Sequence, residues 1–274
     1  MTFEEGYLVL QGVVDRVINM VEGANNQKFT SDEYMEYYAI VFDLSKPGPR
    51  SFENSKQLYD LYDKSFKDYI AHKVLPSLRG KEDGNLLQEL ERRWSNHKTM
   101  IYWLSRFFGY LDRYFTTERK LPSLKEISFL SFYELVFGEM NNQIRDAVIS
   151  MIDREREGEQ IDQALVKNIL AIYMEFGMDS SKYYTGDFEE AMLKDSAAFY
   201  SHKASNWIST KPYEDYMLKV EGCLKHERNM ASQYLPPESQ QKLLEVVEHE
   251  LLVGNASELQ EKKKLDEFIS IESI

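Results

Sequence analysis

Apolar residues recur at intervals of three and four along most of this chain, which is the spacing of helices with one buried face. No segment alternates strictly between apolar and polar residues, as a half-buried strand would. Glycine and proline are scarce, at 13 and 7 residues, which leaves little turn material for many short strands. The pattern predicts an all-α fold, with helices at 8–21, 33–44, 58–70, 85–94, 94–115, 127–156 (as one helix or two), 160–177, 188–194, 197–208, 213–234 and 240–253.

The most aromatic of these segments is 94–115. On a helical wheel its apolar side chains, Met100 and Ile101 among them, cover about half of the circumference, whereas an ordinary surface helix needs a stripe of only about 100°. Tyr102 is the one large ring on the polar half. Such a helix can serve one broad core, or a core on one flank and a partner protein on the other.

The segment 32–44 is also apolar on two neighbouring sides. These sides consist of Tyr37, Ile40, Val41 and Leu44, and of Tyr34, Met35, Tyr38 and Phe42. A short helix this apolar is either fully buried or shared between a core and another protein. The pattern alone favours burial, but tyrosine, phenylalanine and methionine are enriched at the cores of protein interfaces, so both interpretations stay open.

The charge of the chain narrows the range of partners. A net charge of −13 argues against a nucleic-acid binder, which would normally present a basic face. A helix that spans a membrane needs about 18 or more apolar residues in a row, and no such run occurs in the sequence. The first residues are acidic and lack the apolar stretch of a secretory signal, so we expect none. The one cysteine, Cys223, allows neither an internal disulfide nor a cysteine-based zinc site.

Candidate catalytic groups do not combine into a site. His249 and Glu250 begin like a zinc-protease helix, but the second histidine of that motif is missing. The carboxylates of 155–159 fit a solvated helix end, and Cys223 fits a small packed residue. No phosphate-binding loop, nucleophile elbow or dinucleotide fingerprint occurs. We therefore predict a non-enzymatic protein with no catalytic residue, no metal and no cofactor.

Several blocks of the sequence resemble the cullin family, in the order in which that family has them. The resemblance runs from about residue 5 to residue 253 and is closest to the SCF-type cullins. The sequences of the matching blocks resemble those of plant members. The blocks are 34–38 in the second helix, 94–98, 103–107 and 110–114 in the fifth, then 153–162, 187–189, 199–200 and 204–205.

The resemblance implies an elongated rod of five-helix cullin repeats. We expect the first repeat at 1–121 and the second at 122–254. Residues 255–274 depart from the family and hold few apolar residues, so we expect a short, irregular C-terminal tail there. The third repeat and the C-terminal homology domain of the family, which binds the RING subunit, are not found in this sequence.

The resemblance also implies a function as a non-catalytic scaffold segment of an SCF-type cullin-RING ubiquitin ligase, in ubiquitin-dependent protein degradation. In that family the second and fifth helices bind a Skp-type adaptor, which carries an F-box protein. We expect no RING subunit on this segment, and a location in the cytoplasm and nucleus. The adaptor-binding residues implied by position are Tyr34, Met35, Tyr38, Val41, Phe42, Lys98, Met100, Ile101, Arg106 and Tyr110.

Two alternatives stay open. The chain can be a stand-alone, truncated cullin-like protein that competes for adaptors without delivering ubiquitin. From a different class, it can be a helical tethering-complex subunit or a helical enzyme. A buried polar pocket would favour the enzyme, whereas a continuous exposed apolar strip across the second and fifth helices would favour adaptor docking.

Overall fold

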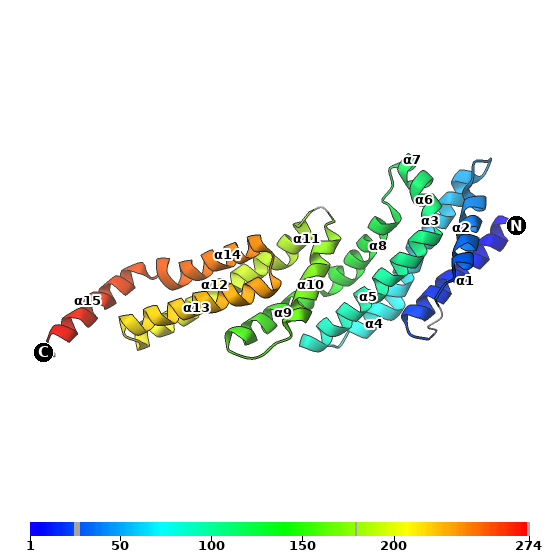
Figure 1. The fold of residues 1–274 in the computed structure, drawn as a ribbon. Coiled ribbons are helices and arrows are strands. Elements are labelled where there is room, and N and C mark those ends of the chain that lie inside the picture. Colours follow the sequence, from blue (N-terminus) through cyan, green and yellow to red (C-terminus); the bar gives the residue numbers. More distant parts are fainter. Residues whose placement is uncertain (25–27, 179, 273–274) are drawn as a thin grey trace. The chain divides into compact units, whose positions relative to one another are not determined.

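The computed structural model describes residues 1–24, 28–178 and 180–272, with the side chains of 269–272 left outside the description. Every regular element among these residues is a helix or a short helical turn, and none is a strand (Figure 1). The predicted all-α fold is confirmed. The chain divides into two compact units, Met1–Ile144 and Arg145–Ile274, and the division falls within one helix. Compact units need not coincide with sequence repeats, so the repeat boundaries at 121 and 254 stay a prediction.

The first unit is built from long helices joined by short turns, of which the five-residue turns labelled η are of the wide π type. Its elements are α1 Phe3–Val21, α2 Ser31–Ser45, α3 Ser51–Tyr69, η1 Ile70–Val74, α4 Leu75–Leu78, α5 Asp83–Phe107, α6 Gly109–Leu111, η2 Asp112–Thr116, α7 Thr117–Arg119, α8 Leu124–Phe132, η3 Tyr133–Phe137 and the start of α9 Gly138–Arg156.

Three helix starts in this unit carry the same local signal. Thr2, Thr30 and Ser123 each accept a backbone N–H three residues on, while a glutamate at that position accepts the N–H of the capping residue. This reciprocal arrangement satisfies two backbone donors that would otherwise have no partner. It fixes where α2 begins, and α2 then packs against α1, α3, α5 and α6.

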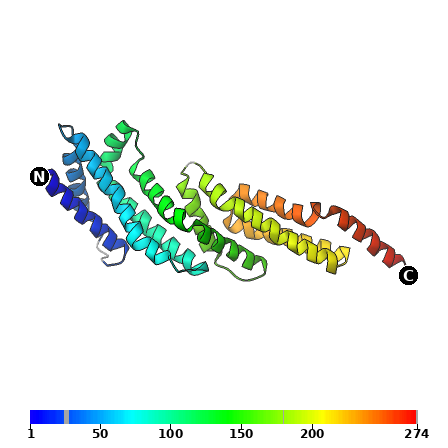
Figure 2. The same ribbon diagram turned by 180° about the vertical axis from the view of Figure 1, so that it is seen from behind.

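The second unit holds the rest of α9, α10 Gln163–Phe176, α11 Lys182–Tyr184, η4 Thr185–Glu189, α12 Glu190–Thr210, α13 Tyr213–Tyr234, α14 Pro237–Glu248, η5 His249–Val253 and α15 Ala256–Glu272. Helices α12, α13 and α14 run side by side in both views (Figures 1 and 2). At its centre, the buried Arg156 donates from Nε to Glu227 at 2.8 Å and from Nη2 to Ser196 at 2.7 Å. The hydroxyl of Tyr200 donates to the same glutamate.

The structure corrects three predictions about the helices. The segments 85–94 and 94–115 do not meet at residue 94, because α5 continues through it and ends at Phe107. Phe108 then has φ −88° and ψ 6°, outside helical values, and Gly109 follows, a residue with low helix propensity. The predicted helices 188–194 and 197–208 form one helix, α12.

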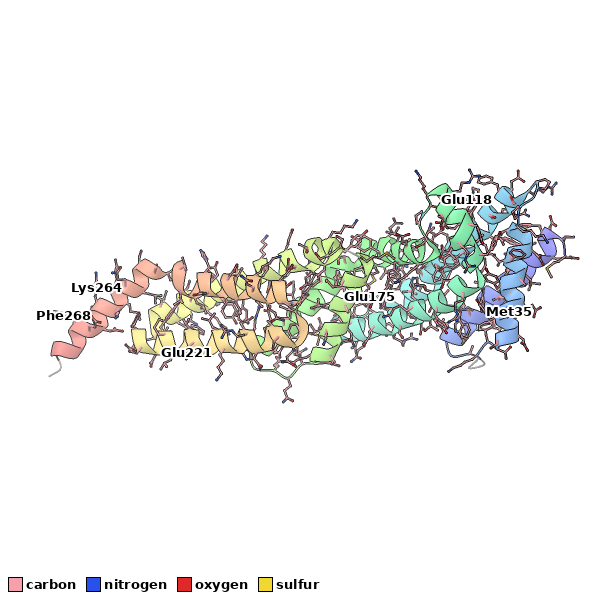
Figure 3. The ribbon with its side chains drawn as sticks, turned by 45° about the horizontal axis from the view of Figure 1, so that its top comes forward. Met35, Glu118, Glu175, Glu221, Lys264 and Phe268 are labelled. Carbon is pink, nitrogen blue, oxygen red and sulfur yellow. The ribbon has the colours of Figure 1, made fainter. Side chains whose placement is uncertain are left out.

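The irregular C-terminal tail was also a wrong prediction, because 256–272 form the helix α15. The segment is rich in good helix formers, alanine, glutamate, lysine and leucine. Few apolar contacts are needed to hold it: Leu259 is buried, Lys262 donates to the backbone oxygen of Ile208 at 2.8 Å, and Asp266 accepts the backbone N–H of Tyr213 at 2.7 Å. Other side chains of the helix, such as Lys264 and Phe268, are exposed (Figure 3).

Candidate protein-docking surface

Helix α2 has one buried side and one exposed side. Ile40, Val41 and Leu44 lie in the core of the first unit. Met35 and Phe42 are 61% and 41% exposed, and Met35 can be seen on α2 in Figure 3. Large apolar side chains are not normally left in contact with water as a group. The helix is therefore shared between a core and a free surface, and is not simply buried.

Helix α5 continues this surface through an arginine and a tyrosine. Arg106 donates from Nη1 to the hydroxyl of Tyr102 at 2.6 Å, and its guanidinium carbon lies 4.8 Å from the centre of that ring. The same carbon lies 5.7 Å from the centre of the Tyr34 ring on α2. An arginine over aromatic rings is held by cation–π attraction while its remaining N–H groups stay available. Arg106 thus joins the exposed sides of the two helices.

The surface extends further along α2 and α6. Phe42 meets Tyr110 edge-to-face, with 5.1 Å between the ring centres, and Tyr110 meets Tyr114 at 4.6 Å. Tyr34 and Tyr38 lie 6.3 Å apart along α2. We call this set the docking strip. It consists of Tyr34, Met35, Tyr38, Phe42, Tyr102, Arg106, Tyr110 and Tyr114.

A layer of packed rings supports the docking strip from below. The ring of Phe107 at the end of α5 lies 5.0 Å from that of Phe29 and 5.3 Å from that of Tyr37. Rings packed this closely hold α2 against α5 and fix the positions of the side chains above them. The strip is therefore part of a rigid helix pair and not of a loop.

An ion pair fixes the start of α2. Arg16 on α1 donates from Nη1 to Glu33 at 2.5 Å and also lies 4.2 Å from the centre of the Phe29 ring. The hydrogen bond from Arg16, together with the N–H of Thr30 in the helix cap, lowers the pKa of Glu33 to about 2. Glu33 is thus ionised at neutral pH, and it directly precedes Tyr34 and Met35 on α2.

The predicted adaptor-binding residues fall into two groups. Tyr34, Met35, Tyr38, Phe42, Lys98 and Arg106 have exposed or half-exposed side chains. Val41 and Met100 have no exposed surface, so the structure excludes them from direct contact with a partner. Ile101 and Tyr110 are mostly buried, although Tyr110 still takes part in the strip through its neighbours.

Two members of the docking strip were not predicted. Tyr102 and Tyr114 are 52% and 46% exposed. Tyr102 was the single large ring on the polar half of the wheel, and that exception was a signal for an exposed functional ring. Tyr114 could not be found in this way, because the wheel assumed one continuous helix through Phe108.

Groups with other chemistry stay apart from the strip. The imidazole of His249 is exposed, and its Nδ1 lies 3.3 Å from a carboxylate oxygen of the neighbouring Glu250. Burial raises the pKa of the Cys223 thiol, which disfavours the reactive thiolate. Within the described ranges, no group of three or more histidine, cysteine or acidic residues could hold a metal ion. In the same ranges, no helix combines the length and apolar character needed to cross a membrane.

Comparison with known proteins places the chain in a family. The model of the cullin alpha solenoid domain matches residues 10–274. Cullin-1 of Oryza sativa subsp. japonica is 48% identical over 260 residues, which are 95% of this chain and 35% of that protein. Two Arabidopsis thaliana proteins are also similar. Putative cullin-like protein 2 is 44% identical over 92% of this chain and 67% of its own length, and cullin-like protein 3 is 38% identical over 89% of this chain and 94% of its own.

The chain thus spans about a third of the length of the Oryza cullin, and nearly all of cullin-like protein 3. The domain match covers almost every residue that the structure describes, and the all-helical architecture agrees with an alpha solenoid. The chain belongs to the cullin family.

Proposed function

We propose that this chain acts as a non-catalytic scaffold segment of an SCF-type cullin-RING ubiquitin ligase. In this proposal the docking strip binds a Skp-type adaptor, and through it an F-box protein. The observation that carries the proposal is the strip itself, since it joins exposed apolar side chains of α2 to an arginine and tyrosines of α5 and α6.

The chemistry of the strip matches that of an energetic centre in an interface. Tyrosine and arginine are the residues most often found at binding hot spots, together with tryptophan, and Met35 supplies an adaptable apolar side chain. Met35 is the most exposed large hydrophobic side chain of the strip, so it has much apolar surface to bury on binding. Because α2 and α5 are already packed, little ordering would be required when a partner arrives.

The direct test is a titration of the purified chain with a Skp-type adaptor by calorimetry. We expect saturable binding. A double variant, Tyr34→Ala with Met35→Ala, should weaken that binding by about thirtyfold or more, the equivalent of roughly 2 kcal/mol for one lost hot spot. The control is Leu218→Ala, which removes a similarly exposed leucine of α13 in the second unit and should leave the affinity unchanged.

An unchanged affinity in the double variant would contradict the assignment of the docking strip.

The scaffold role is separable from adaptor binding. We expect no RING subunit on residues 1–274, and its co-purification with them would contradict this part of the proposal. Reporter fusions in plant cells should show the chain in both cytoplasm and nucleus.

A second candidate function is favoured by the 94% coverage of the short cullin-like protein 3. In this role the chain would bind adaptors without delivering ubiquitin and would compete with longer cullins. Added to a reconstituted SCF-type ligase, it would then inhibit ubiquitin transfer, and excess adaptor would restore the rate. A lack of inhibition at concentrations that saturate the adaptor would exclude this role.

A further inference from the structure

Arg106 is the one charged residue of the docking strip, whose other members are tyrosines, a methionine and a phenylalanine. Its side chain is exposed on α5, beside the ring of Tyr34 from α2. A partner that covers the strip would therefore remove one positive charge from water. An unpaired charge is costly to bury, so a partner that binds tightly has to supply an opposite charge at this place.

Two nitrogens of the Arg106 guanidinium have no acceptor within the described ranges of the chain. Nη1 donates to the hydroxyl of Tyr102 at 2.6 Å, which leaves Nε and Nη2 without a hydrogen bond there. In the same ranges no carboxylate forms an ion pair with Arg106. Its positive charge is therefore balanced by water and by the faces of two rings, and not by an acid of its own chain.

The nitrogens that Arg106 leaves free are the pair with which other arginines of this chain hold a carboxylate. Arg79 donates from Nε and Nη2 to the two oxygens of Glu139, at 2.7 Å each. Arg92 holds Glu89 through the same two nitrogens. The planar guanidinium matches the two oxygens of a carboxylate in this way, and such paired bonds are stronger than bonds between neutral groups. Arg106 presents this same edge at an exposed position.

The acids next to Arg106 and Tyr34 in the sequence already have partners. Asp112, the acid nearest to Arg106 along the chain, accepts the backbone N–H of Leu124 at 2.7 Å. Glu33, which precedes Tyr34, is bound by Arg16. Each of these carboxylates would have to give up a contact that caps or joins helices before it could turn to Arg106. A carboxylate for the free edge is therefore expected from a partner.

We propose that Arg106 binds the carboxylate of one aspartate or glutamate side chain of the adaptor, through Nε and Nη2. Tyr102 is a positioning residue in this contact, because its hydroxyl holds Nη1 and leaves the other edge for the partner. The two rings hold the guanidinium before binding, which reduces the loss of side-chain freedom on docking. This inference rests on the proposed function, and it adds which chemical group of the partner α5 recognises. Arg106 is then a specificity-determining residue, since an adaptor with an uncharged side chain at this place would leave its charge unpaired.

The first experiment measures adaptor affinity by calorimetry, with an adaptor made in bacteria so that it carries no phosphate. Arg106→Gln should weaken binding by about tenfold or more, and the affinity should then depend less on salt than in the wild type. Arg106→Lys should recover only part of the loss, because an ammonium lacks the planar pair of donors. The matched control is Arg228→Gln, at an exposed arginine of α13 in the second unit, which should bind as the wild type does.

The outcomes of this experiment are distinct. An unchanged affinity and salt dependence in Arg106→Gln would overturn the proposal. Full affinity in Arg106→Lys would overturn the contact through two nitrogens. Circular dichroism of each variant checks that the fold is kept, which is expected because the Arg106 side chain is exposed.

The second experiment exchanges the charges. Arg106→Glu should weaken binding by about a hundredfold, because two carboxylates would then face each other. Among adaptor variants in which one surface aspartate or glutamate is replaced by arginine, one should bind Arg106→Glu at least about tenfold better than the unaltered adaptor does. The same adaptor variant should bind the wild-type chain more weakly. If no such variant restores binding, or if only a change at the C-terminal carboxylate of the adaptor does so, the assignment to an acidic side chain is wrong.

The positioning role of Tyr102 is tested in two backgrounds. Tyr102→Phe keeps the ring and removes only the hydroxyl that accepts from Arg106. It should weaken adaptor binding by about threefold in the wild type and cause no further loss in Arg106→Gln, since the two residues act as one unit. An equal loss in both backgrounds would mean that the hydroxyl acts without Arg106, and would overturn its positioning role.

Failure of this inference can be told apart from failure of the proposed function. If the wild type binds the adaptor and the Tyr34 and Met35 double variant does not, while Arg106→Gln binds normally, then the docking strip stands and the carboxylate contact is wrong. If no adaptor binds the wild type, the proposed function is wrong, and the contact of Arg106 with an adaptor is wrong with it.

Discussion

His97 on α5 donates from Nε2 to the backbone oxygen of Ser128 on α8, over 2.9 Å. The acceptor is a carbonyl, so the proton of the neutral imidazole is on Nε2. The other ring nitrogen, Nδ1, is buried and has no hydrogen-bond partner in the described part of the chain. The rings of Trp94, Phe66 and Phe132 surround the imidazole with centres within 5.5 Å.

This environment predicts acid sensitivity of the first unit. Burial lowers the pKa of His97 to about 4, from about 6.5 in the unfolded chain. Because the unfolded state binds this proton first, the stabilisation is complete above pH 6.5 and is lost as the pH falls toward 4. The full loss is about 3 kcal/mol. Urea unfolding at pH 7.5, 6.5, 5.5 and 4.5 measures it.

The control for that experiment is His97→Gln, which can still donate to Ser128 but does not titrate. Its stability should be lower at pH 7.5 because the packing is less good, but nearly constant down to pH 4.5. Carboxylates with lowered pKa, such as Glu33 at about 2, begin to lose their contribution near pH 5, and they do so equally in the wild type and the variant. Parallel pH profiles of the wild type and the variant would contradict the role assigned to His97.

The pair of Arg156 and Glu227 predicts a large effect in the second unit. Both side chains are buried, and the negative charge of Glu227 raises the pKa of Arg156 against the effect of burial. Glu227→Leu would leave a buried arginine without its main partner and should cost about 3–5 kcal/mol. The double variant Arg156→Met with Glu227→Leu should recover most of this loss. Thermal unfolding followed by circular dichroism checks both.

An exposed ion pair serves as the comparison. Arg154 and Glu159 are paired at 2.7 Å on the surface of the same unit, with both side chains about half exposed. Arg154→Met should cost less than about 1 kcal/mol. If Arg154→Met destabilises the chain as much as Glu227→Leu does, then burial is not the reason for the large loss of stability expected at the Arg156 pair.

Two glycines of α1 predict opposite outcomes for the same substitution. A Cβ at Gly6 would lie 2.8 Å from Cδ1 of Leu44 and 3.3 Å from Cγ2 of Ile40, both on the buried side of α2. A Cβ at Gly12 would meet nothing within 4 Å. Gly12→Ala should stabilise the chain by up to about 1 kcal/mol through helix propensity. Gly6→Ala should instead destabilise it by about 1 kcal/mol or more through overpacking.

Chemical denaturation of the two glycine variants under identical conditions makes this comparison. Because both residues are in the same helix, the gain in propensity is about the same and the difference reports the contact with α2. Equal stabilities would mean that α1 moves away from α2 freely, and would weaken the description of α2 as tightly packed on its inner side.

The attachment of α15 predicts a local effect. Asp266 accepts the backbone N–H of Tyr213, the first residue of α13, and so acts as a helix cap supplied from another helix. Asp266→Ala should cost about 1 kcal/mol, as the loss of a capping residue does. Hydrogen exchange should become faster in α15 and in the first turn of α13. The control Glu261→Ala, at an exposed position of the same helix, should leave both unchanged.

Periodicity identified the helices and showed that α2 and α5 each have two apolar sides. The start of α2 has a local cause, because the side chains of Thr30 and Glu33 cap it reciprocally. The sequence did not show which apolar residues are in the core and which are on the surface. Val41 and Phe42 are both apolar neighbours on α2, yet one is buried and the other is exposed. The same limit applies to Met100, which is buried by helices that lie far from it in sequence.

The break at Phe108 could not be predicted for a different reason. It depends on the backbone of Phe108, and the single glycine that follows, Gly109, is tolerated inside many helices and so does not predict a break by itself. The helix α15 was missed because its stability depends on hydrogen bonds to Ile208 and Tyr213, which are distant in sequence. The few apolar residues of that segment indicated only that it was too polar to pack against other helices.

The wide turn η2, Asp112–Thr116, makes the number of residues in this stretch important for the docking strip. A π turn takes up one residue more than an α turn, so it acts as a single-residue insertion that rotates everything after it by about 100° relative to everything before it. A gene that lost one codon between Gly109 and Thr117 could keep every aromatic residue and still present a different set of rings. In the proposed docking strip, the number of residues in this stretch therefore decides which rings share a face, separately from which residues they are.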